Sequence, residues 1–379
     1  SQKLKVVIWN YQDYLRYLDN NEILECNDVY EVGVVSKGYR FCEKYLLEPF
    51  IEDRITDRKV VGAILNEKKE RERLALEMYP HLREWFNQLE FDYEGALAKL
   101  LSKKPWCNPY DRLALERIRD KAWFFRLDNT AGRLHTNLTN VSKLVRPFLS
   151  YKGQSLVALD VANAQPFLAT CLLCPDFYSE SWIVNGPISI HSILTKPTLF
   201  GANPQLYREI FEPMAKFLKN RVNHSIHKPK IDDYSGWVAG GNFYEKCAEA
   251  FNIETGLATF NRDIMKKTMY IVFYGRNNTA DPYKKIFKSL FPIHCKVFYG
   301  LKKKAHNHLP ILLQAMEAHI VLDRIVGRIA SERPDVPLFT IHDCVATIPE
   351  HVEYIKEVML QELYQAVGIR PTLKPERWE

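Results

Sequence analysis

The chain lacks the features that typically mark membrane and secreted proteins. Its 379 residues contain no uninterrupted apolar run of about eighteen, the length that a helix needs to cross a bilayer. The first residues, SQKLKVVIWNYQDYL, do not have the pattern of a signal peptide. The eight cysteines are scattered, and their spacing does not resemble a disulfide framework. We therefore expect no membrane partner and a cytoplasmic, reducing compartment.

Several nucleotide-binding and metal-binding signatures are also missing. No G-x4-GK[ST] sequence occurs, so nothing indicates a P-loop NTPase. Cys171 and Cys174 have C-x2-C spacing without a second cysteine pair, which favours a core helix over a zinc knuckle. The net charge is only +6, which permits a polyanionic partner without requiring one. Because 46% of the residues are hydrophobic, the chain can form a folded core, and its length of 379 residues suggests two or three lobes.

The patterns that are present indicate an α+β fold. Runs rich in β-branched and aromatic residues predict strands at Val6–Trp9 and Ser155–Leu159, the second leading into a helix that begins near Asn163. Residues 129–150 are expected to be extended and rich in loops. Apolar residues at helical spacing predict helices over much of 60–128, including one after Pro109, and over Glu254–Gly275, Leu309–Ile329 and Glu353–Ala366.

Two acidic residues follow apolar runs that are typical of strands. Asp160 ends SLVALD, and Asp343 lies in TIHDCVATIPE, where a polar pair between β-branched runs predicts a hairpin tip. Asp also suits turns for local reasons, and spacing alone does not bring the two acids together. Side by side on a sheet, they would stay ionised only with a cation between them, and oxygen ligands suit Mg²⁺. Two such ions, for which Mn²⁺ can substitute, support phosphoryl transfer.

A third segment, FNRDIMKKTMYIVFYGRNN, carries two cations and two aromatic residues at intervals of four. Arg262, Lys266, Tyr270 and Tyr274 would lie along one stripe of a helix. The cations can meet the phosphates of a nucleoside triphosphate, and the rings can pack against its base and sugar. Lys266 can also donate a proton to the leaving pyrophosphate. The same spacing also fits an ordinary amphipathic helix with solvated cations and core tyrosines.

Together these segments resemble the palm and fingers motifs of the family A DNA polymerases, the bacterial DNA polymerase I type, and of the related phage-type single-subunit RNA polymerases. In that family the first motif is a strand ending in Asp, with a polar or acidic residue five positions later, here Asp160 and Gln165. The second is a helix with the pattern R-x3-K-x3-[FY]-x3-YG, and RDIMKKTMYIVFYG contains every element. The third is a hairpin carrying His-Asp, here His342 and Asp343.

Two weaker similarities fall in the right order along the chain. AGRLHTNLTN and LLQAMEAHI resemble the segments whose Arg and Gln contact the minor groove of the primer–template, which would be Arg133 and Gln314. The resemblance implies that both donate to purine N3 and pyrimidine O2, acceptors that every base pair presents. The motifs cover roughly residues 130–350 and leave the N-terminal third without a match.

The resemblance also implies roles at the reaction centre. Asp160 and Asp343, with the main-chain carbonyl of Val161, would bind the two Mg²⁺ ions. Arg262 and Lys266 would hold the triphosphate of the incoming nucleotide. The partners implied are a primer–template nucleic acid and deoxynucleoside triphosphates.

The remaining positions bear on the nucleotide and the primer. Tyr270 would lie against the sugar and base, Tyr274 near the templating pair, and His342 at the primer end. Gln165 stands where the DNA polymerases usually have Glu, a residue that excludes the ribose 2′-hydroxyl, and the phage-type RNA polymerases have a small residue. Gln165 can obstruct a 2′-hydroxyl or hydrogen-bond it, because its amide is both donor and acceptor. Cys344 replaces a Glu that is common in the DNA enzymes.

We therefore predict a right-hand polymerase with an antiparallel palm sheet, helical fingers and a reduced helical thumb. Residues 1–128 would form a mostly helical region that can serve as the thumb, 129–175 and 309–379 the palm, and 176–308 the fingers. The predicted activity is template-directed extension of a 3′ end by a DNA polymerase. RNA polymerase or primase activity, template-independent end addition, and a non-catalytic nucleic-acid-binding role remain alternatives.

Overall fold

The computed structural model describes residues 10–27, 38–45, 48, 54, 56–103, 109–179, 186–194, 207–222, 233–278 and 281–379. The chain divides into two compact units. Unit 1 comprises Ser1–Arg126, His135–Ser155 and Trp378–Glu379, and unit 2 comprises Leu127–Leu134 and Leu156–Arg377. The expected strand Val6–Trp9 lies outside the described residues. The four-part division into thumb, palm and fingers stays a prediction.

Unit 1 is mainly helical, as expected for residues 60–128. Its helices are α2 (Tyr11–Asn20), α3 (Arg58–Met78), α4 (Pro80–Phe86), α5 (Tyr93–Lys103) and α6 (Pro109–Arg119). Its strands form two small antiparallel sheets: β1 (Leu24–Cys26) with β2 (Tyr39–Phe41), and β6 (Leu149–Tyr151) between β3 (Leu89–Phe91) and β7 (Gln154–Ser155). Two further strands, β4 (Phe125–Leu127) and β5 (Leu134–Thr136), pair with each other, and their residues Leu127 and Leu134 belong to unit 2. Pro109 begins α6, where its missing N–H would have no partner in any case.

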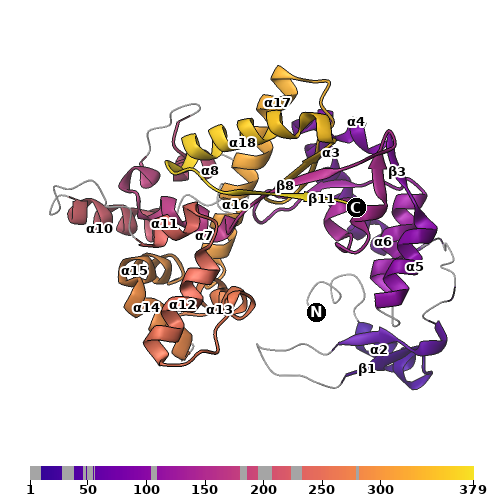
Figure 1. Ribbon diagram of the computed structural model, residues 1–379. Coiled ribbons are helices and arrows are strands. Elements are labelled where there is room, and N and C mark those ends of the chain that lie inside the picture. The colour runs from indigo at the N-terminus through magenta and orange to yellow at the C-terminus, as the bar shows by residue number, and fades with distance from the viewer. Residues whose placement is uncertain are drawn as a thin grey trace. The chain divides into compact units, whose positions relative to one another are not determined.

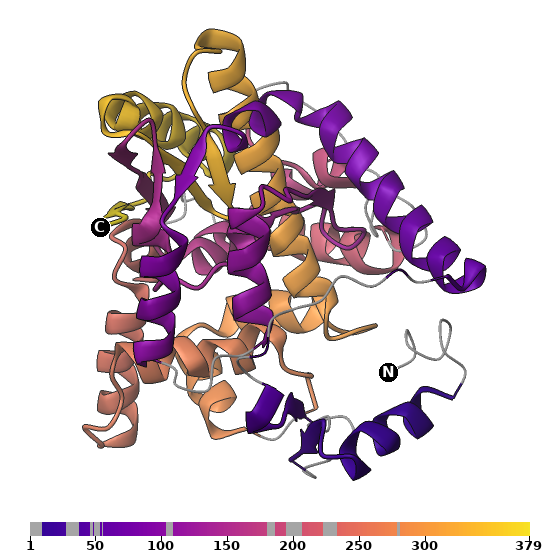
Figure 2. The same ribbon diagram turned by 90° about the vertical axis from the view of Figure 1, so that its right-hand side faces the viewer.

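An aromatic cluster forms part of the core of unit 1. The ring of Phe86, at the end of α4, meets the edges of Trp123 at 5.4 Å and Phe125 at 4.7 Å between centroids. Helices α5 and α6 contact each other and lie side by side (Figure 1, Figure 2). They bury Leu100 and Leu115. Burial of these large side chains supplies most of the driving force that holds the helices together.

Unit 2 contains one four-stranded sheet and many helices. The strands are β8 (Val157–Val161), β9 (Phe339–Ile341), β10 (Cys344–Thr347) and β11 (Leu373–Arg377). The helices near the sheet in sequence are α7 (Ala164–Ala169), α8 (Ile190–Leu194), α16 (His308–Ala318), α17 (Gly327–Glu332) and α18 (Val352–Val367). The others are α10 (Glu212–Val222), α11 (Asp233–Ala239), α12 (Phe243–Thr255), α13 (Arg262–Tyr274), α14 (Pro282–Leu290) and α15 (Pro292–Leu301).

The sheet of unit 2 is antiparallel throughout, in the order β11-β8-β10-β9. Strand β8 is central, and four of its five residues are buried. Helix α18 contacts β8 and lies along one face of the sheet (Figure 1). The expected hairpin in TIHDCVAT is confirmed as β9 and β10. The α+β class is therefore confirmed, and the assignment of this sheet to a palm stays a prediction.

A long helical segment connects the sheet to the helices α13 and α15. Helix α16 continues without a break through the π-helical residues His319–Val326 into α17, so the helix expected at Leu309–Ile329 is confirmed (Figure 2). On its far side Arg324 and Arg328 donate to the buried carboxylate of Glu362 on α18, at 2.9 and 3.1 Å. These two ion pairs connect the segment to α18. Helix α18 itself, Val352–Val367, confirms the helix expected at Glu353–Ala366.

Two expected elements differ from the structure. The helix expected at Glu254–Gly275 is two helices, because Gly256 adopts φ +66° after α12 and ends it. Asn261 then begins α13 by accepting a hydrogen bond from the Ile264 amide at 3.0 Å. The strand expected at Ser155–Leu159 begins two residues later, so Asp160 lies within β8 rather than after it.

Candidate active site

Asp160 and Asp343 come together because β8 and β10 are neighbouring strands. Cys344 pairs with Asp160 across the two strands, and Asp343 precedes Cys344 in the tight turn between β9 and β10. His342, the other turn residue, has φ +57°. Left-handed φ values are uncommon outside glycine, and His adopts them more readily than most residues. The hairpin thus places Asp343 immediately before β10, beside Asp160 on the neighbouring strand β8.

The electrostatic environment of these carboxylates is unfavourable without a cation. Burial, reinforced by the charges of Glu317 and Asp160, raises the pKa of Asp343 well above its ordinary value. Burial also raises the pKa of Glu317, against the opposing effect of Arg133. A divalent cation would relieve this repulsion, and carboxylate oxygens are the donors that Mg²⁺ prefers. The residues present therefore fit Mg²⁺.

The candidate metal site has two carboxylates to offer, because Glu317 is engaged by Arg133 and Gln165. Within the described ranges, no group of three or more His, Cys, Asp and Glu side chains is arranged to hold a metal ion. A Mg²⁺ ion at Asp160 and Asp343 would need further oxygen ligands from water, main chain or substrate phosphates. Mg²⁺ sites in proteins commonly combine one or two carboxylates with such ligands.

Helix α13 presents its polar stripe to solvent and its apolar face to the core. Met265, Met269 and Phe273 are buried, whereas Arg262 and Lys266 are exposed. Tyr270 is 54% exposed, so the alternative of core tyrosines does not describe it. Its ring lies 5.4 Å from that of Tyr274, the next residue of the stripe. Two cations and a pair of rings are therefore available along one side of the helix.

One cavity of about 330 Å³ in unit 2 collects most of the predicted site residues. Those that line it are Arg133, Asp160, Val161, Gln165, Arg262, Lys266, Tyr270, Tyr274, His342 and Asp343. Gln314 is half-buried on α16 and is not among the lining residues. Arg262 also forms an ion pair with Glu245 at 3.0 Å, which a phosphate would have to displace or join. The cavity thus brings the two acids of the sheet together with the cations and rings of α13.

Three further titratable residues of this cavity were not predicted from the sequence. Glu317 lies on α16 and is 3% exposed; the sequence signal was an acid within the apolar helix LPILLQAMEAHI. Tyr244 comes from α12, and burial raises the pKa of its hydroxyl. Lys374 comes from β11, where it pairs in register with Asp160. No local pattern distinguishes Tyr244 or Lys374.

Two lysines hold the C-terminal end of α13, next to Tyr274. The Lys302 amine donates to the carbonyl oxygens of Val272 at 2.6 Å and Gly275 at 3.0 Å. The Lys284 amine donates to the carbonyl oxygen of Arg276. Burial, with a smaller contribution from the charge of Lys284, lowers the pKa of Lys302 to about 8. These contacts satisfy carbonyl groups that the end of the helix leaves without intrahelical partners.

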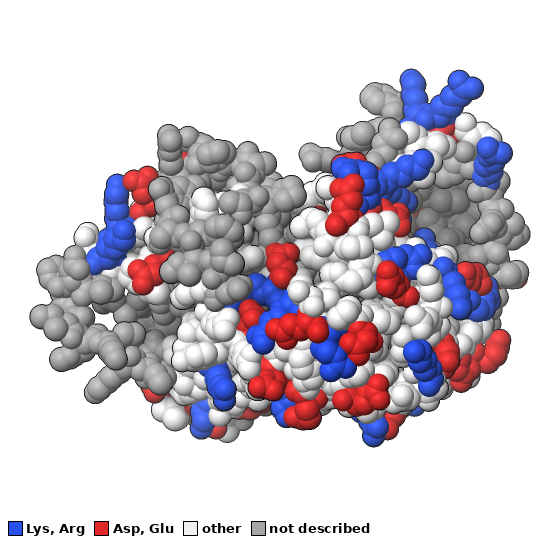
Figure 3. Space-filling model, turned by 90° about the horizontal axis from the view of Figure 1, so that it is seen from above, with Lys and Arg blue, Asp and Glu red and all other residues white. Residues whose placement is uncertain are grey.

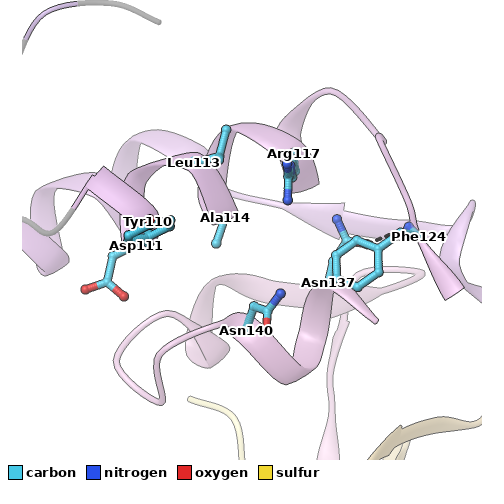
Figure 4. Close-up of a pocket in the computed structure, with 8 residues that line it drawn as sticks. All are labelled: Tyr110, Asp111, Leu113, Ala114, Arg117, Phe124, Asn137 and Asn140. Carbon is cyan, nitrogen blue, oxygen red and sulfur yellow. Dashed lines mark hydrogen bonds between the residues drawn. The ribbon is translucent and has the colours of Figure 1, made fainter. Parts of the chain in front are cut away.

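Unit 1 has a separate cavity of about 280 Å³ between α6 and the turn Asn137–Asn140 (Figure 4). Tyr110, at its rim, is 79% exposed. The Asn137 amide is already used, because it accepts from the Phe124 N–H and donates to the Ala122 carbonyl. This cavity lacks the convergent charged groups of the cavity in unit 2.

The surface gives a weaker signal than the cavity. On the face shown in Figure 3, acidic and basic side chains are interleaved over the described residues rather than gathered into a patch of one sign.

Within the part of the chain that the structure describes, none of the helices has the length and apolar character required to cross a membrane.

The comparisons with known proteins found similarity among solved structures. No protein-family model matches the chain, and no curated protein matches it. Among solved structures, the chain is similar to the POL domain of Pol1 from M. smegmatis in complex with DNA primer-template and dNTP. The TM-score is 0.33 and the sequence identity 11%, over 82% of this chain and 65% of that chain. The chain thus spans slightly less than two thirds of the solved structure.

Proposed function

We propose that the chain is a template-directed nucleotidyltransferase that extends a nucleic-acid 3′ end, with deoxynucleoside triphosphates as the first candidate substrates. The observation that carries this proposal is the cavity of unit 2, where Asp160 and Asp343 face the same space as the polar stripe of α13. Paired carboxylates, cations and aromatic rings are the three groups that a nucleoside triphosphate with its metal ions requires.

The reaction uses the residues of the cavity in distinct roles. The primer 3′-oxygen forms a bond to the α-phosphorus, the bond from that phosphorus to the β-phosphate oxygen breaks, and pyrophosphate leaves. Arg262 and Lys266 bind the triphosphate, and Lys266 donates a proton to the pyrophosphate oxygen while the hydroxyl proton passes to water. Asp160, Asp343 and the Val161 carbonyl would hold Mg²⁺, which would lower the pKa of the attacking hydroxyl and offset charge on the phosphates.

The nucleic acid would contact the same end of unit 2. Tyr270 and Tyr274 offer rings for the base and sugar. Arg133 and His342 line the cavity and would contact the primer–template, whereas Gln314 would need to reach it from α16. We expect affinity for nucleic acid to fall with rising salt, because phosphate contacts release counterions.

A second candidate is the same chemistry with ribonucleotides. The observation that favours it is the side chain of Gln165, which lines the cavity and whose buried amide oxygen has no hydrogen-bond partner among the described residues. Such an acceptor can bind a sugar hydroxyl, whereas a carboxylate at this position would repel the nearby acids as well.

The proposal is tested by extension of a labelled primer on a template with Mg²⁺. Asp343→Asn should lower incorporation by on the order of 1000-fold or more, because Mg²⁺ loses one of its two carboxylates. Asp335→Asn is the matched control, since Asp335 is an exposed acid paired with Arg333. Both variants should bind primer–template like the unmodified chain in fluorescence anisotropy. Full activity of Asp343→Asn would refute the metal assignment, and absence of both extension and nucleotide binding would refute the function.

A further inference from the structure

Lys374 is a further cation of the candidate active site, and it comes from the sheet rather than from α13. It lies on the edge strand β11 and pairs in register with Asp160 on β8 (Figure 1). Directly opposite residues of antiparallel strands project from the same face of the sheet, with their Cβ atoms about 4.5–5.5 Å apart. Both side chains line the same cavity. Lys374 thus brings a positive charge to the face of the sheet that carries Asp160.

The amine of this lysine is available to a ligand. Lys374 is exposed, and among the described residues its amine has neither an ion-pair partner nor a hydrogen-bond partner. Arg262, by contrast, is already paired with Glu245. An ammonium group is a compact point charge with three donors, which suits the oxygens of a phosphate. Lys374 therefore fits an anionic ligand of the cavity.

The backbone that carries Lys374 is held in place just before it. The Ala162 N–H donates to the Thr372 carbonyl at 3.0 Å, and the Thr372 hydroxyl donates to the Ala239 carbonyl at 2.9 Å. Gly241 approaches so closely that a Cβ on it would lie 2.8 Å from the Cβ of Thr372. These contacts fix the start of β11 against the turn between α11 and α12. The lysine therefore projects from a rigid part of unit 2, as a binding residue requires.

The order of the strands indicates which phosphates Lys374 would contact. Strand β8 lies between β11 and β10, so Lys374 and Asp343 are on opposite sides of Asp160. The primer end would lie at the hairpin of Asp343 and His342. The turn that holds β11 leads into α12, which packs against α13, the helix that carries Lys266. Lys374 therefore lies on the side of the triphosphate and away from the primer end.

We propose that Lys374 is a substrate-binding residue that contacts the β- and γ-phosphates of the incoming nucleotide, the part that leaves as pyrophosphate. This proposal rests on the function proposed above and adds a cation of the sheet to Arg262 and Lys266 of α13. One charge-assisted hydrogen bond to a phosphate corresponds to at least about a tenfold difference in affinity. The primer backbone offers phosphate oxygens as well, so the test must separate the two sources.

The test measures, in Mg²⁺, the dissociation constants of a fluorescent deoxynucleoside triphosphate, of the matching monophosphate and of a primer–template. Lys374→Gln should weaken triphosphate binding by at least about tenfold and leave the other two constants unchanged. Lys374→Arg keeps the charge and should recover most of the affinity. Lys267→Gln is the matched control, because Lys267 is exposed on α13 and loses the same charge without lining the cavity. It should leave all three constants unchanged.

Each contrary outcome has a distinct meaning. Equal triphosphate affinities for Lys374→Gln and Lys267→Gln would overturn the inference while the proposed function stands. A loss confined to the primer–template would also overturn it, because Lys374 would then contact the primer backbone. Weakening of all three ligands with a lower melting temperature would assign Lys374 a structural role instead. If the unmodified chain neither incorporates nor binds any nucleotide, the proposed function falls, and the inference falls with it.

Discussion

Replacing Lys302 with methionine should change how the stability of the chain depends on pH. Lys302 is 3% exposed, and its amine lies among the carbonyl groups that end α13. Burial is the first cause that lowers the pKa of Lys302 from 10.5 to about 8. The side chain therefore holds fewer protons in the folded chain than in the unfolded chain between these two values.

The magnitude and sign follow from proton linkage. Stability rises with pH wherever the unfolded state binds more protons, by about 1.4 kcal/mol per pH unit for one group. The interval from about 8 to 10.5 gives a rise of about 3 kcal/mol in the free energy of unfolding. Below pH 8 both states are protonated and the contribution is constant. At pH 7, Lys302→Met removes the free-energy cost of burying a charged amine. It also leaves two carbonyl oxygens without their donor, which costs about 1–3 kcal/mol each and offsets that gain.

The measurement is urea unfolding of the unmodified chain and of Lys302→Met at pH 7, 8, 9 and 10. Other groups titrate in this range, but they do so in both proteins, so the difference between the two free energies isolates Lys302. That difference should move by about 2.5 kcal/mol in favour of the unmodified chain between pH 7 and pH 10. Lys303→Met is the matched control, because Lys303 is the next residue and is exposed. Parallel pH profiles for the unmodified chain and Lys302→Met would refute the argument.

Three further changes test the scaffold and the site. Glu362→Ala removes the shared acceptor of two arginines, so the free energy of unfolding measured in urea should fall by about 3–5 kcal/mol. The control Glu332→Ala, which removes an exposed carboxylate, should lower it by less than about 1 kcal/mol. Equal losses for the two variants would contradict this reasoning. A Cβ on Gly275 would lie 2.5 Å from the Ile271 carbonyl oxygen, so Gly275→Ala should cost about 1–3 kcal/mol and lower the melting temperature, and an unchanged melting temperature would disagree. Asp343→Asn removes one of the crowded charges and should raise stability in EDTA by about 1 kcal/mol in thermal unfolding, whereas a loss would count against repulsion at this site.

Local patterns in the sequence were sufficient for the segments that carry Asp160, Asp343 and the polar stripe of α13. Alternating β-branched residues around a polar pair predicted the hairpin of Asp343, and the run before Asp160 predicted its strand with an error of two residues. Four-residue spacing predicted that Arg262 to Tyr274 share one stripe. The break between α12 and α13 was missed, although Gly256 and Asn261 are both residues that end or begin helices, because apolar residues continue across it.

The sequence by itself therefore determined which segments become strands, hairpin and helix, since those choices depend on neighbours a few positions apart. Only the tertiary structure decided which side chains meet. Glu317 is 184 positions from Arg133 and 152 from Gln165, and Lys302 caps a helix that ends 28 residues earlier. Such contacts depend on how packed elements exclude water around a polar group. A buried charge must find a partner wherever the fold provides one, and no local periodicity encodes that partner.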